Sequence, residues 1–254
     1  MMLARARRAA ILGLALLLPR SLCIPQEPRD ARALPSPLAH WDFEDVVGDT
    51  VRDRVGERDG TLAGTGSLPE VVPGIAGQAL KLRPDEGHCV IVRCEPFDLA
   101  DGVTVMAWVR FDSLSDYQEI IGHQREQARD NRYPLRGFRL LLAAKSLQFR
   151  IGDGSEQELV CAAERFCVPE GHWAHVAGSY DGRAMRVYVN AAERAITEVT
   201  AAIAPQPRPL VLGRYLSTRR VAYPFRGLID DVRIYGAALS QSQILQAAAQ
   251  ALGQ

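Results

Sequence analysis

The stretch Gly171–Asn190, GHWAHVAGSYDGRAMRVYVN, decides the fold class of this chain. In residues 173–180, neither of the two alternating sets of positions carries Asp, Glu, Lys or Arg, which is typical of a β-strand covered on both faces. Asp181-Gly182 then supplies the positive-φ dipeptide of a tight hairpin, and apolar and polar residues alternate again over 185–190. The stretch predicts an antiparallel hairpin at the centre of a β-rich domain.

Further strands are predicted on both sides of this hairpin. Residues 103–111 are apolar on both faces, as in a central strand of a sandwich, whereas residues 38–44 alternate between apolar and polar. Ser240 is a suitable N-cap for a short helix over residues 240–252. The pattern predicts an all-β fold, an antiparallel two-sheet sandwich of jelly-roll character with a short C-terminal helix. The other predicted strands are 77–82, 88–92, 119–123, 137–144, 146–151, 193–199, 209–214 and 227–235.

The composition is that of a globular protein without a strong charge preference. The 254 residues are 47% hydrophobic, with 30 basic and 30 acidic side chains. That length suits one large all-β domain. Nucleic acids and anionic membranes attract concentrated basic surfaces, so a net charge of zero gives no electrostatic reason to expect either as a partner.

The N-terminal segment is predicted to be a signal peptide, residues 1–23. Basic residues at its start precede the apolar run Ala9–Leu18, which is too short to span a bilayer, and cleavage is expected after Cys23. Lipidation of Cys23 fits less well, because Leu22 stands where a small residue normally precedes a lipidated cysteine. Residues 24–37 form a proline-rich linker, and residues 38–254 form the domain. The mature protein is expected to be secreted, periplasmic or at the cell surface, with no membrane insertion.

An even number of cysteines remains after removal of Cys23, and in an exported protein this favours disulfides over metal thiolates. Cys161 and Cys167 bracket a short loop before the central hairpin and are predicted to form a bridge. Cys89 and Cys94 would lie about 17 Å apart along one extended strand, beyond the reach of a disulfide. They could pair only if the chain turns between them, so crossed pairings with 161 and 167 stay open.

Several motifs occur together in one order along the chain. Taken together they resemble the laminin-G-like domains of the concanavalin A-like lectin/glucanase superfamily, in the bacterial exported type, over residues 38 to about 248. The resemblance implies a jelly-roll sandwich. One departure is Ala191, which stands where the family commonly has glycine after the asparagine that ends the hairpin. The motifs are HWDFED, DRVGERDGTL, GIAGQALKL, VTVMAWVRF, the central hairpin and GLIDDVRIYGAALSQSQI.

Asp230 is the carboxylate whose position most needs an explanation. Alternation places it on the apolar face of its predicted strand, where an uncompensated charge is costly. The loop Gly48–Gly60 offers carboxylates among glycines, and Ca²⁺ prefers such oxygen ligands. The resemblance implies a structural Ca²⁺ between this loop and the last strand, held by Asp53 and Asp230 and also by Glu44 and Asp59. The alternative is that the loop acids serve turns and that Asp230 accepts hydrogen bonds from backbone or arginine.

Two arginine-rich loops are the candidate ligand-binding segments. Aromatic rings stack on sugars, and guanidinium groups suit carboxylate or sulfate. The first loop contributes Arg132 and Tyr133, and the second contributes Tyr215, Arg219 and Tyr223. The alternative interpretation is that both are solvated charged loops.

The sequence favours binding over catalysis. It contains neither the alternating E-x-D-x-E motif of glycoside hydrolases of this superfamily nor a G-x-S-x-G motif, and no enzymatic activity is predicted. We therefore expect an exported, non-catalytic recognition module for a polysaccharide or glycoprotein surface, with a structural calcium ion. The alternatives are a protein-binding structural or adhesion domain and a glycoside hydrolase.

Overall fold

The computed structural model describes residues 33–253 apart from 116, 124–133 and 216–221. The predicted signal peptide, most of the predicted linker and three of the predicted ligand contacts (Arg132, Tyr133 and Arg219) lie outside these residues. Within the described part of the chain, no helix combines the length and hydropathy that crossing a bilayer requires.

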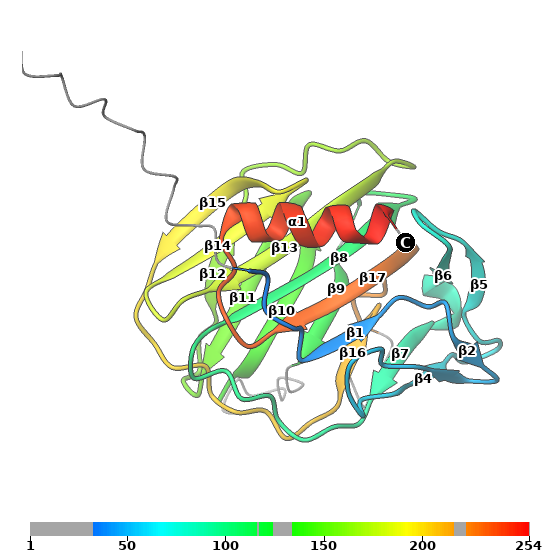
Figure 1. The fold of residues 1–254 in the computed structure, drawn as a ribbon, viewed down its shortest axis with the longest axis horizontal. Coiled ribbons are helices and arrows are strands. Elements are labelled where there is room, and N and C mark those ends of the chain that lie inside the picture. The colour runs from blue at the N-terminus through cyan, green and yellow to red at the C-terminus, as the bar shows by residue number, and fades with distance from the viewer. Residues whose placement is uncertain (1–32, 116, 124–133, 216–221, 254) are drawn as a thin grey trace, which may run out of the picture. The chain divides into compact units, whose positions relative to one another are not determined.

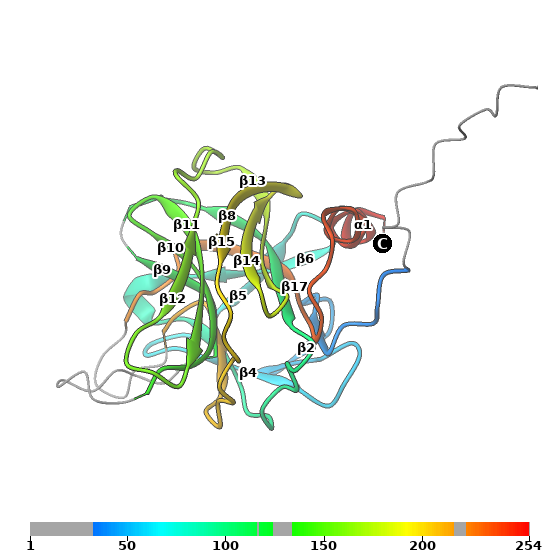
Figure 2. The same ribbon diagram turned by 90° about the vertical axis from the view of Figure 1, so that its left-hand side faces the viewer.

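The domain is a sandwich of two antiparallel sheets, as predicted (Figures 1 and 2). The eight-stranded sheet A has the order β15 (Ala192–Glu198), β14 (Ala184–Val189), β13 (Trp173–Tyr180), β8 (Val103–Phe111), β17 (Gly227–Tyr235), β6 (Gln78–Leu82) and β5 (Glu70–Pro73), and β1 (Ala39–Trp41) also pairs with β17. The nine-stranded sheet B has the order β12 (Leu159–Ala162), β11 (Ser146–Asp153), β10 (Arg136–Ala143), β9 (Gln118–His123), β16 (Leu210–Leu212), β7 (Cys89–Val92), β4 (Gly60–Ala63), β3 (Thr50–Val51) and β2 (Val46–Val47). A single-turn 3₁₀ helix, Pro84–Glu86, lies between β6 and β7.

The apolar core fills the space between the inner faces of the two sheets. Trp41 of β1, Val176 of β13 and Phe149 of β11 are fully buried in it. At Gly178 an added Cβ would lie 2.4 Å from the Phe149 ring, so glycine there allows the aromatic ring of one sheet to approach the backbone of the other. Removal of this apolar surface from water is the main stabilising contribution to the sandwich.

The central hairpin forms as predicted, with a different turn. β13 pairs with β14 in antiparallel register, and β13 is buried along nearly its whole length on both faces. Only Gly182 of the predicted dipeptide has positive φ, at +83°. Asp181 instead closes the turn with its carboxylate, whose Oδ1 accepts hydrogen bonds from the backbone N–H groups of Arg183 and Ala184 at 2.8 and 2.7 Å.

Helix α1 (Gln241–Leu252) covers the outer face of sheet A, on the side away from sheet B (Figure 2). It begins at the predicted N-cap, where the Ser240 hydroxyl and the Gln243 side chain form a reciprocal capping box. Ile244 and Ala247 pack against Met106 of β8 and Tyr235 of β17 in a second apolar cluster. Sheet A is therefore covered on both faces, whereas no helix of the described residues covers the outer face of sheet B.

The alternation predicted for the last strand is interrupted by a β-bulge. The pairing of β17 with β8 shifts register between Asp230 and Arg233, and Asp231 has a φ of +45°. Ile229 and Val232 face the core on either side of this irregularity. The placement of Asp230 on the core face was therefore wrong, because the bulge turns both consecutive aspartates to the outer face of sheet A.

All four described cysteines are free thiols. The predicted bridge between Cys161 and Cys167 is not formed, because Cys161 points from β12 into the core whereas Cys167 is exposed in the following loop. Burial raises the pKa of the Cys161 thiol above its ordinary value. The inward thiol acts as a small apolar side chain in this structure.

The two-residue turn between β10 and β11 provides a test of the hairpin geometry. Ala144 and Lys145 both have positive φ, at +50° and +64°, and both are exposed. We expect Lys145→Gly to raise the free energy of unfolding by about 0.5–1 kcal/mol, because glycine adopts this conformation without the Cβ penalty. Urea unfolding measures the change. The same substitution at Lys81, within β6, should lower the free energy of unfolding, and a loss at both positions would contradict the assigned turn.

Candidate functional site

Three tyrosines gather on the outer face of sheet B and form what is here called the tyrosine cluster. The Tyr223 ring centroid lies 5.3 Å from that of Tyr117 and 5.8 Å from that of Tyr215. Tyr117 is 45% exposed and Tyr223 is 37% exposed, whereas Tyr215 is almost buried beneath them. Large exposed aromatic rings in contact with one another form a surface suited to binding.

Backbone hydrogen bonds hold the cluster against the sheet. Tyr215 follows β16, and its N–H donates to the Ala222 carbonyl at 2.9 Å in an antiparallel bridge between these two residues. The Tyr223 carbonyl accepts from the N–H of Glu119 in β9 at 2.9 Å. Tyr117 immediately precedes β9, so all three rings are positioned by strands that pair within one sheet.

Arg139 lies beneath the rings. Its neighbours in β10, Phe138 and Leu140, point into the core, so alternation directs the guanidinium outward. The guanidinium carbon lies 4.6 Å from the Tyr215 ring centroid and 5.7 Å from that of Tyr223. Such contacts of a desolvated cation with ring faces are attractive and orient the rings.

A buried chain of charges neutralises Arg139. Its Nε donates to the Glu119 carboxylate at 2.9 Å, and its Nη1 donates to Glu158 at 3.3 Å. Glu158 in turn accepts from Arg150 at 2.6 Å. Glu119 is fully buried and Arg139 nearly so. The guanidinium is therefore engaged with protein carboxylates, and its role at this site is to position the tyrosines.

The pKa shifts follow from burial and from these pairings. Burial raises the pKa of Glu119, and the contact with Arg139 counteracts that rise. Burial opposes the charged form of Arg139, but the Glu119 carboxylate holds the pKa of the guanidinium above its ordinary value. Burial would also raise the pKa of Glu158, but Arg139 and Arg150 hold it below its ordinary value.

The structure brings two of the predicted ligand residues together, Tyr215 and Tyr223. Tyr117 and Arg139 were missed. Their sequence signals are weak but present: Tyr117 lies two residues before Glu119, and Arg139 is the lone charge in the apolar run GFRLLLAA. A charged residue within such a run indicates a partner on a neighbouring strand.

Carboxylates also meet at a second place, a cavity of about 180 Å³ on the helix-covered side of sheet A. Its polar lining is Asp42, Glu44, Asp230 and Asp231, and Ile75–Gly77 and Ala251 complete it. An added Cβ at Gly77 would lie 1.9 Å from Glu44 Oε1, so glycine there lets the backbone approach the carboxylate. We call this space the acidic cavity.

Glu44 and Asp230 each use one oxygen in backbone hydrogen bonds at the acidic cavity. Glu44 Oε1 accepts from the Gln78 N–H at 2.6 Å, and Asp230 Oδ2 accepts from the Ile75 N–H at 3.0 Å. Burial raises the pKa of Asp230 to about 7, and the charge of Asp231 adds to the rise. Asp231 Oδ2 is buried without a hydrogen-bond partner among the described residues.

Asp53 and Asp59, the other two predicted calcium ligands, lie elsewhere. Asp53 Oδ1 accepts from the backbone N–H groups of His40 and Val55 at 2.9 and 3.2 Å. Asp59 accepts from the Asp53 N–H at 2.9 Å and pairs with Arg52. These hydrogen bonds fix the course of the loop between β3 and β4, as the turn alternative predicted for loop acids.

The acidic cavity fits a hard cation in the chemistry of its donors. Carboxylate oxygens are the ligands that Ca²⁺ prefers, and the unpartnered Asp231 oxygen is a buried acceptor that a cation would satisfy. As these side chains stand, no group of three or more His, Cys, Asp or Glu residues in the described part of the chain is gathered closely enough to hold a metal ion.

The buried pair beneath the tyrosine cluster leads to a stability prediction. We expect Arg139→Met to lower the free energy of unfolding by about 3–5 kcal/mol, because Glu119 would remain as an uncompensated buried charge. Urea unfolding of the double variant Glu119→Met/Arg139→Met should show a smaller loss than the single variant. A single variant within about 1 kcal/mol of the wild type would contradict the assigned pairing.

Comparison with known proteins agrees with the sandwich fold. Residues 84–245 match a laminin-G family model described as the concanavalin A-like lectin/glucanases superfamily. A search of curated proteins returned no match.

Solved structures with the same fold include sugar-bound domains. Domain 4 of AbnA, a GH43 extracellular arabinanase from Geobacillus stearothermophilus, in complex with arabinotriose, aligns with a TM-score of 0.61 and 22% identity over 83% of this chain and 97% of that domain. The binding domain of botulinum neurotoxin DC in complex with SialylT aligns with a TM-score of 0.61 and 14% identity, over 84% of this chain and 50% of that one.

The binding domain of Paraclostridial Mosquitocidal Protein 1 gives a TM-score of 0.61 and 15% identity, over 82% of this chain and 50% of its own. The chain thus spans half the length of each toxin binding domain. At these identities the similarity concerns the fold. The family match over most of the sequence shows that the chain belongs to the concanavalin A-like lectin/glucanases superfamily.

Proposed function

We propose that this chain is an exported, non-catalytic recognition module that binds a polysaccharide or the glycans of a glycoprotein surface. The observation that carries the proposal is the tyrosine cluster, in which the exposed rings of Tyr117 and Tyr223 lie in contact and the Tyr223 ring faces the buried Arg139. A sugar ring presents a face of C–H groups, which packs on an aromatic face, and hydroxyl groups at its edge.

Rigidity of the cluster supports this proposal. Side chains that are already fixed lose little conformational entropy when a ligand binds, so more of the contact energy appears as affinity. Here the ion pair between Glu119 and Arg139 fixes the position of the guanidinium, which faces the Tyr215 and Tyr223 rings. The structures of the arabinanase domain with arabinotriose and of the toxin domain with SialylT are further support, since that fold presents sugar sites in those proteins.

Among the described residues, the two carboxylates that bond Arg139 beneath the cluster support a non-catalytic role. A glycosidase presents an acid and a second carboxylate on either side of the scissile bond. Glu119 is fully buried and bonded to Arg139, and Glu158 is held between Arg139 and Arg150. Neither carboxylate faces a substrate at the tyrosine cluster.

The predicted contacts Arg132, Tyr133 and Arg219 lie outside the described residues and remain predictions. In the sequence, Arg219 belongs to the segment between Tyr215 and Ala222. Arginine at that place would favour glycans that carry carboxylate or sulfate groups.

A glycan array followed by calorimetry tests the proposal. We expect saturable binding of at least one glycan class, and at least a tenfold weaker affinity for Tyr223→Ala, because the exposed stacking face is removed. Leu245→Ala, an exposed apolar side chain on α1, is the matched control and should bind as the wild type does. A Tyr223→Ala variant with unchanged affinity would refute the tyrosine cluster as the glycan site. Capture of one protein partner without competition by sugars would favour the adhesion alternative.

We further propose that the acidic cavity binds a structural Ca²⁺, with Glu44 and Asp230 as ligands and Asp42 and Asp231 beside them. The ion would compensate the buried Asp230 carboxylate, since Asp42 already pairs with Arg54 and Asp231 with Arg233. It would also link the segment after β1 to the last strand. It would stabilise the folded state by mass action.

The raised pKa of Asp230 makes this calcium proposal testable by pH. Because that pKa rises from 3.8 to about 7 on folding, the metal-free folded protein binds more protons than the unfolded chain between these values, and its stability falls as the pH rises through that window. We expect thermal unfolding in EDTA to show this fall and Ca²⁺ to reverse it above pH 7. Asp230→Asn should lose both effects, whereas Asp59→Asn should keep the response to Ca²⁺. No response in the wild type would remove calcium from the proposed function.

A further inference from the structure

β15 forms one edge of sheet A, and no strand of the described residues pairs with its outer side. It lies beside β12, an edge strand of sheet B, on one side of the sandwich (Figure 2). An open edge presents backbone N–H and C=O groups to which another strand can hydrogen-bond. β15 has seven residues, whereas β5 at the opposite edge of sheet A has four and ends at Pro73, which has no N–H to donate. β15 is therefore the edge of sheet A that is better suited to pairing.

The pairing of β15 with β14 determines which of its backbone groups face the open side. Val199, just after the strand, donates its N–H to the Arg183 carbonyl at 2.8 Å. In an antiparallel ladder, alternate residues bond the same neighbour, so the residues at 195, 197 and 199 bond β14. The N–H and C=O groups of Ile196 and Glu198 consequently point away from β14, toward the open edge.

Ile196 lies at the middle of this open edge. It is opposite Arg186, whose neighbours Met185 and Val187 point into the core, so its side chain is on the outer face of sheet A. The side chain is 52% exposed. A β-branched apolar side chain that is exposed at an unpaired edge favours pairing with another strand.

Two opposite charges flank Ile196 along the strand, Arg194 and Glu198. Both side chains are exposed, and neither belongs to an ion pair within the described part of the chain, where Arg186 pairs with Asp181 and Glu193.

This charge pattern is complementary to itself. If a second copy of β15 pairs antiparallel with the first and Ile196 lies opposite the partner subunit's Ile196, then each Arg194 lies opposite a Glu198. Opposite charges across a strand pair stabilise the pairing. Moving the centre of the pairing by one residue puts one of the two charges opposite Ile196 instead. Charge complementarity therefore selects both the partner, a second copy of this chain, and the register.

A β-bulge at Arg194 limits the regular part of the edge. Val187 is opposite Ala195 and Tyr188 is opposite Glu193, so Arg194 is the additional residue. Bulges often protect edges against pairing. This one lies near the start of the strand and leaves residues 195–198 regular, and the long side chain of Arg194 can still extend to a carboxylate of a neighbouring copy.

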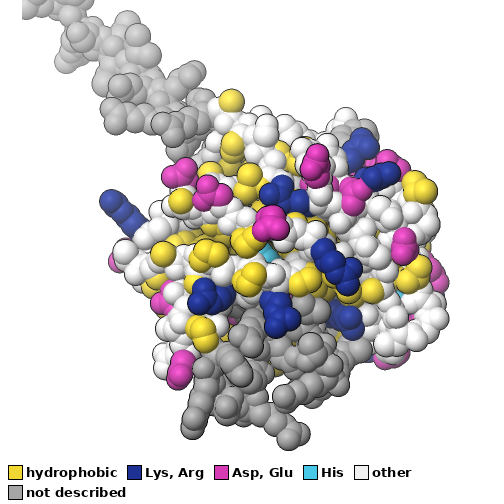
Figure 3. Space-filling model, turned by 90° about the horizontal axis from the view of Figure 1, so that it is seen from below, with side chains coloured by type: hydrophobic (Ala, Val, Ile, Leu, Met, Phe, Trp, Pro, Cys, Tyr) yellow, Lys and Arg dark blue, Asp and Glu magenta, His cyan; other side chains and the backbone are white. Residues whose placement is uncertain are grey.

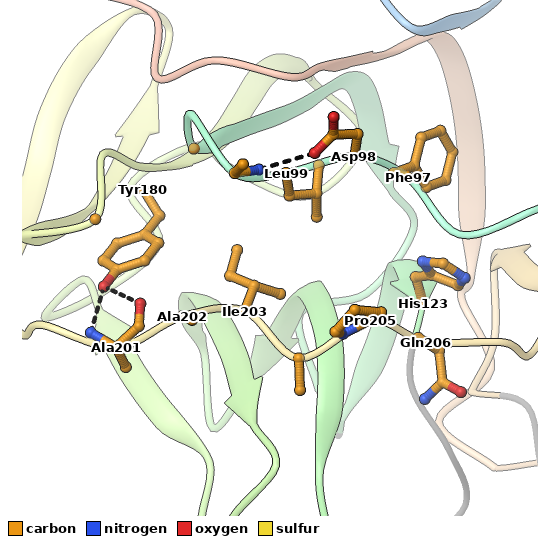
Figure 4. Close-up of a pocket in the computed structure, with 15 residues that line it drawn as sticks. Phe97, Asp98, Leu99, His123, Tyr180, Ala201, Ala202, Ile203, Pro205 and Gln206 are labelled. Carbon is orange, nitrogen blue, oxygen red and sulfur yellow. Dashed lines mark hydrogen bonds between the residues drawn. The ribbon is translucent and has the colours of Figure 1, made fainter.

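The chain is held in place before and after the edge. Before β15, the Asn190 side chain accepts from the His175 N–H at 2.9 Å. After β15, the Tyr180 hydroxyl accepts from the Ala201 N–H at 2.8 Å and donates to the Ala201 carbonyl at 2.7 Å (Figure 4). An edge that is already ordered loses little conformational entropy when a partner binds.

We propose that the chain forms a two-fold dimer in which the β15 strands of two copies pair antiparallel, centred on Ile196, with an Arg194–Glu198 pair on each side. Such an interface uses the same surface of both subunits and closes on itself. Sheet A then continues across the dimer. The ends of each sandwich stay open, because the copies join along their sides. One of these ends carries a band of hydrophobic side chains with Lys and Arg around it (Figure 3).

The dimer has a consequence for binding, and this part of the inference rests on the proposed function. The two-fold axis of an antiparallel strand pair is perpendicular to the sheet. Both copies of sheet B therefore lie on the same side of the joined sheet A, and both tyrosine clusters face the same direction. Two sites with one orientation bind a repeating polysaccharide or a glycan-covered surface bivalently.

Analytical ultracentrifugation over a range of protein concentrations tests the dimer. A single strand pair makes a small interface, so we expect a reversible monomer–dimer equilibrium. Ile196→Asp should weaken association at least tenfold, because two like charges then lie opposite each other. Glu57→Arg, a charge reversal at an exposed residue in the loop between β3 and β4, is the control and should associate as the wild type does. A wild type that stays monomeric overturns the inference and leaves the edge to an extended segment of another protein.

An exchange of charges tests the arrangement independently of folding. Arg194→Glu alone and Glu198→Arg alone each place like charges opposite each other, so each should associate at least tenfold more weakly than the wild type at low ionic strength. An equimolar mixture of these two variants should associate again, because every pair in the mixed dimer has opposite charges. A mixture that stays monomeric although the wild type dimerises overturns the arrangement, and so does a dimer that Ile196→Asp leaves intact.

Glycan arrays printed at low and at high density test the bivalent orientation. On dense spots the wild type should be retained at least tenfold more strongly than Ile196→Asp, whereas on sparse spots the two proteins should bind equally. A protein that dimerises but binds no printed glycan refutes the proposed function and leaves the dimer standing. Equal retention of both proteins on dense spots overturns the common orientation of the two clusters.

Discussion

Burial of sheet A on both faces is the constraint on which the rest of this structure depends. Its central strands carry apolar side chains inward to the core and also outward, toward Ile244 and Ala247 of α1. Without the helix, the outward side chains would be exposed to water as one large apolar face. The capping box at Ser240 starts the helix at the place from which it can cross that face. Both faces of sheet A are thereby occupied by packing contacts, whereas the outer face of sheet B carries the exposed tyrosines.

In sheet B, by contrast, a charged residue stands inside an apolar strand. Arg139 stands between core residues of β10 and could not be desolvated without compensation. Compensation by Glu119 and Glu158 fixes the guanidinium, and the guanidinium lies against two tyrosine rings. The tyrosine cluster and the buried ionic network are thus parts of one arrangement. A change in the network would alter both the stability of the fold and the orientation of the rings.

The architecture could be predicted from the sequence because its long strands obey simple periodicity. β8 and β17 begin and end at the predicted residues, and α1 follows the predicted cap. The short strands β2 to β5 and β12 were not predicted, since two to four residues give too little alternation to be distinguished from loops.

The sites were harder to predict, for physical reasons that differ between residues. Because of the bulge at Asp231, Asp230 lies on the outer face of sheet A and not on the face predicted from alternation. The alternation of apolar and polar residues in the sequence does not indicate a bulge. Tyr117 and Arg139 are 22 residues apart in sequence and meet Tyr223 only through pairing within sheet B, so no local pattern joins them. Glu44 and Asp230 line one cavity, whereas Asp53 and Asp59, which the resemblance grouped with them, form hydrogen bonds elsewhere.

The pairing of β1 with β17 sets the order in which this domain can be completed. Trp41 of the first strand lies opposite Val232 of the last, and the contact between His40 and Asp231 spans 191 residues of sequence. Closing so long a loop is entropically costly, and domains rich in such distant pairings fold slowly. During synthesis, β1 cannot pair with β17 until nearly all of the domain has left the ribosome, and the edge of sheet A stays incomplete until then. A chain interrupted before β17 would therefore expose that edge and a half-formed core, which makes it a substrate for chaperones or for aggregation.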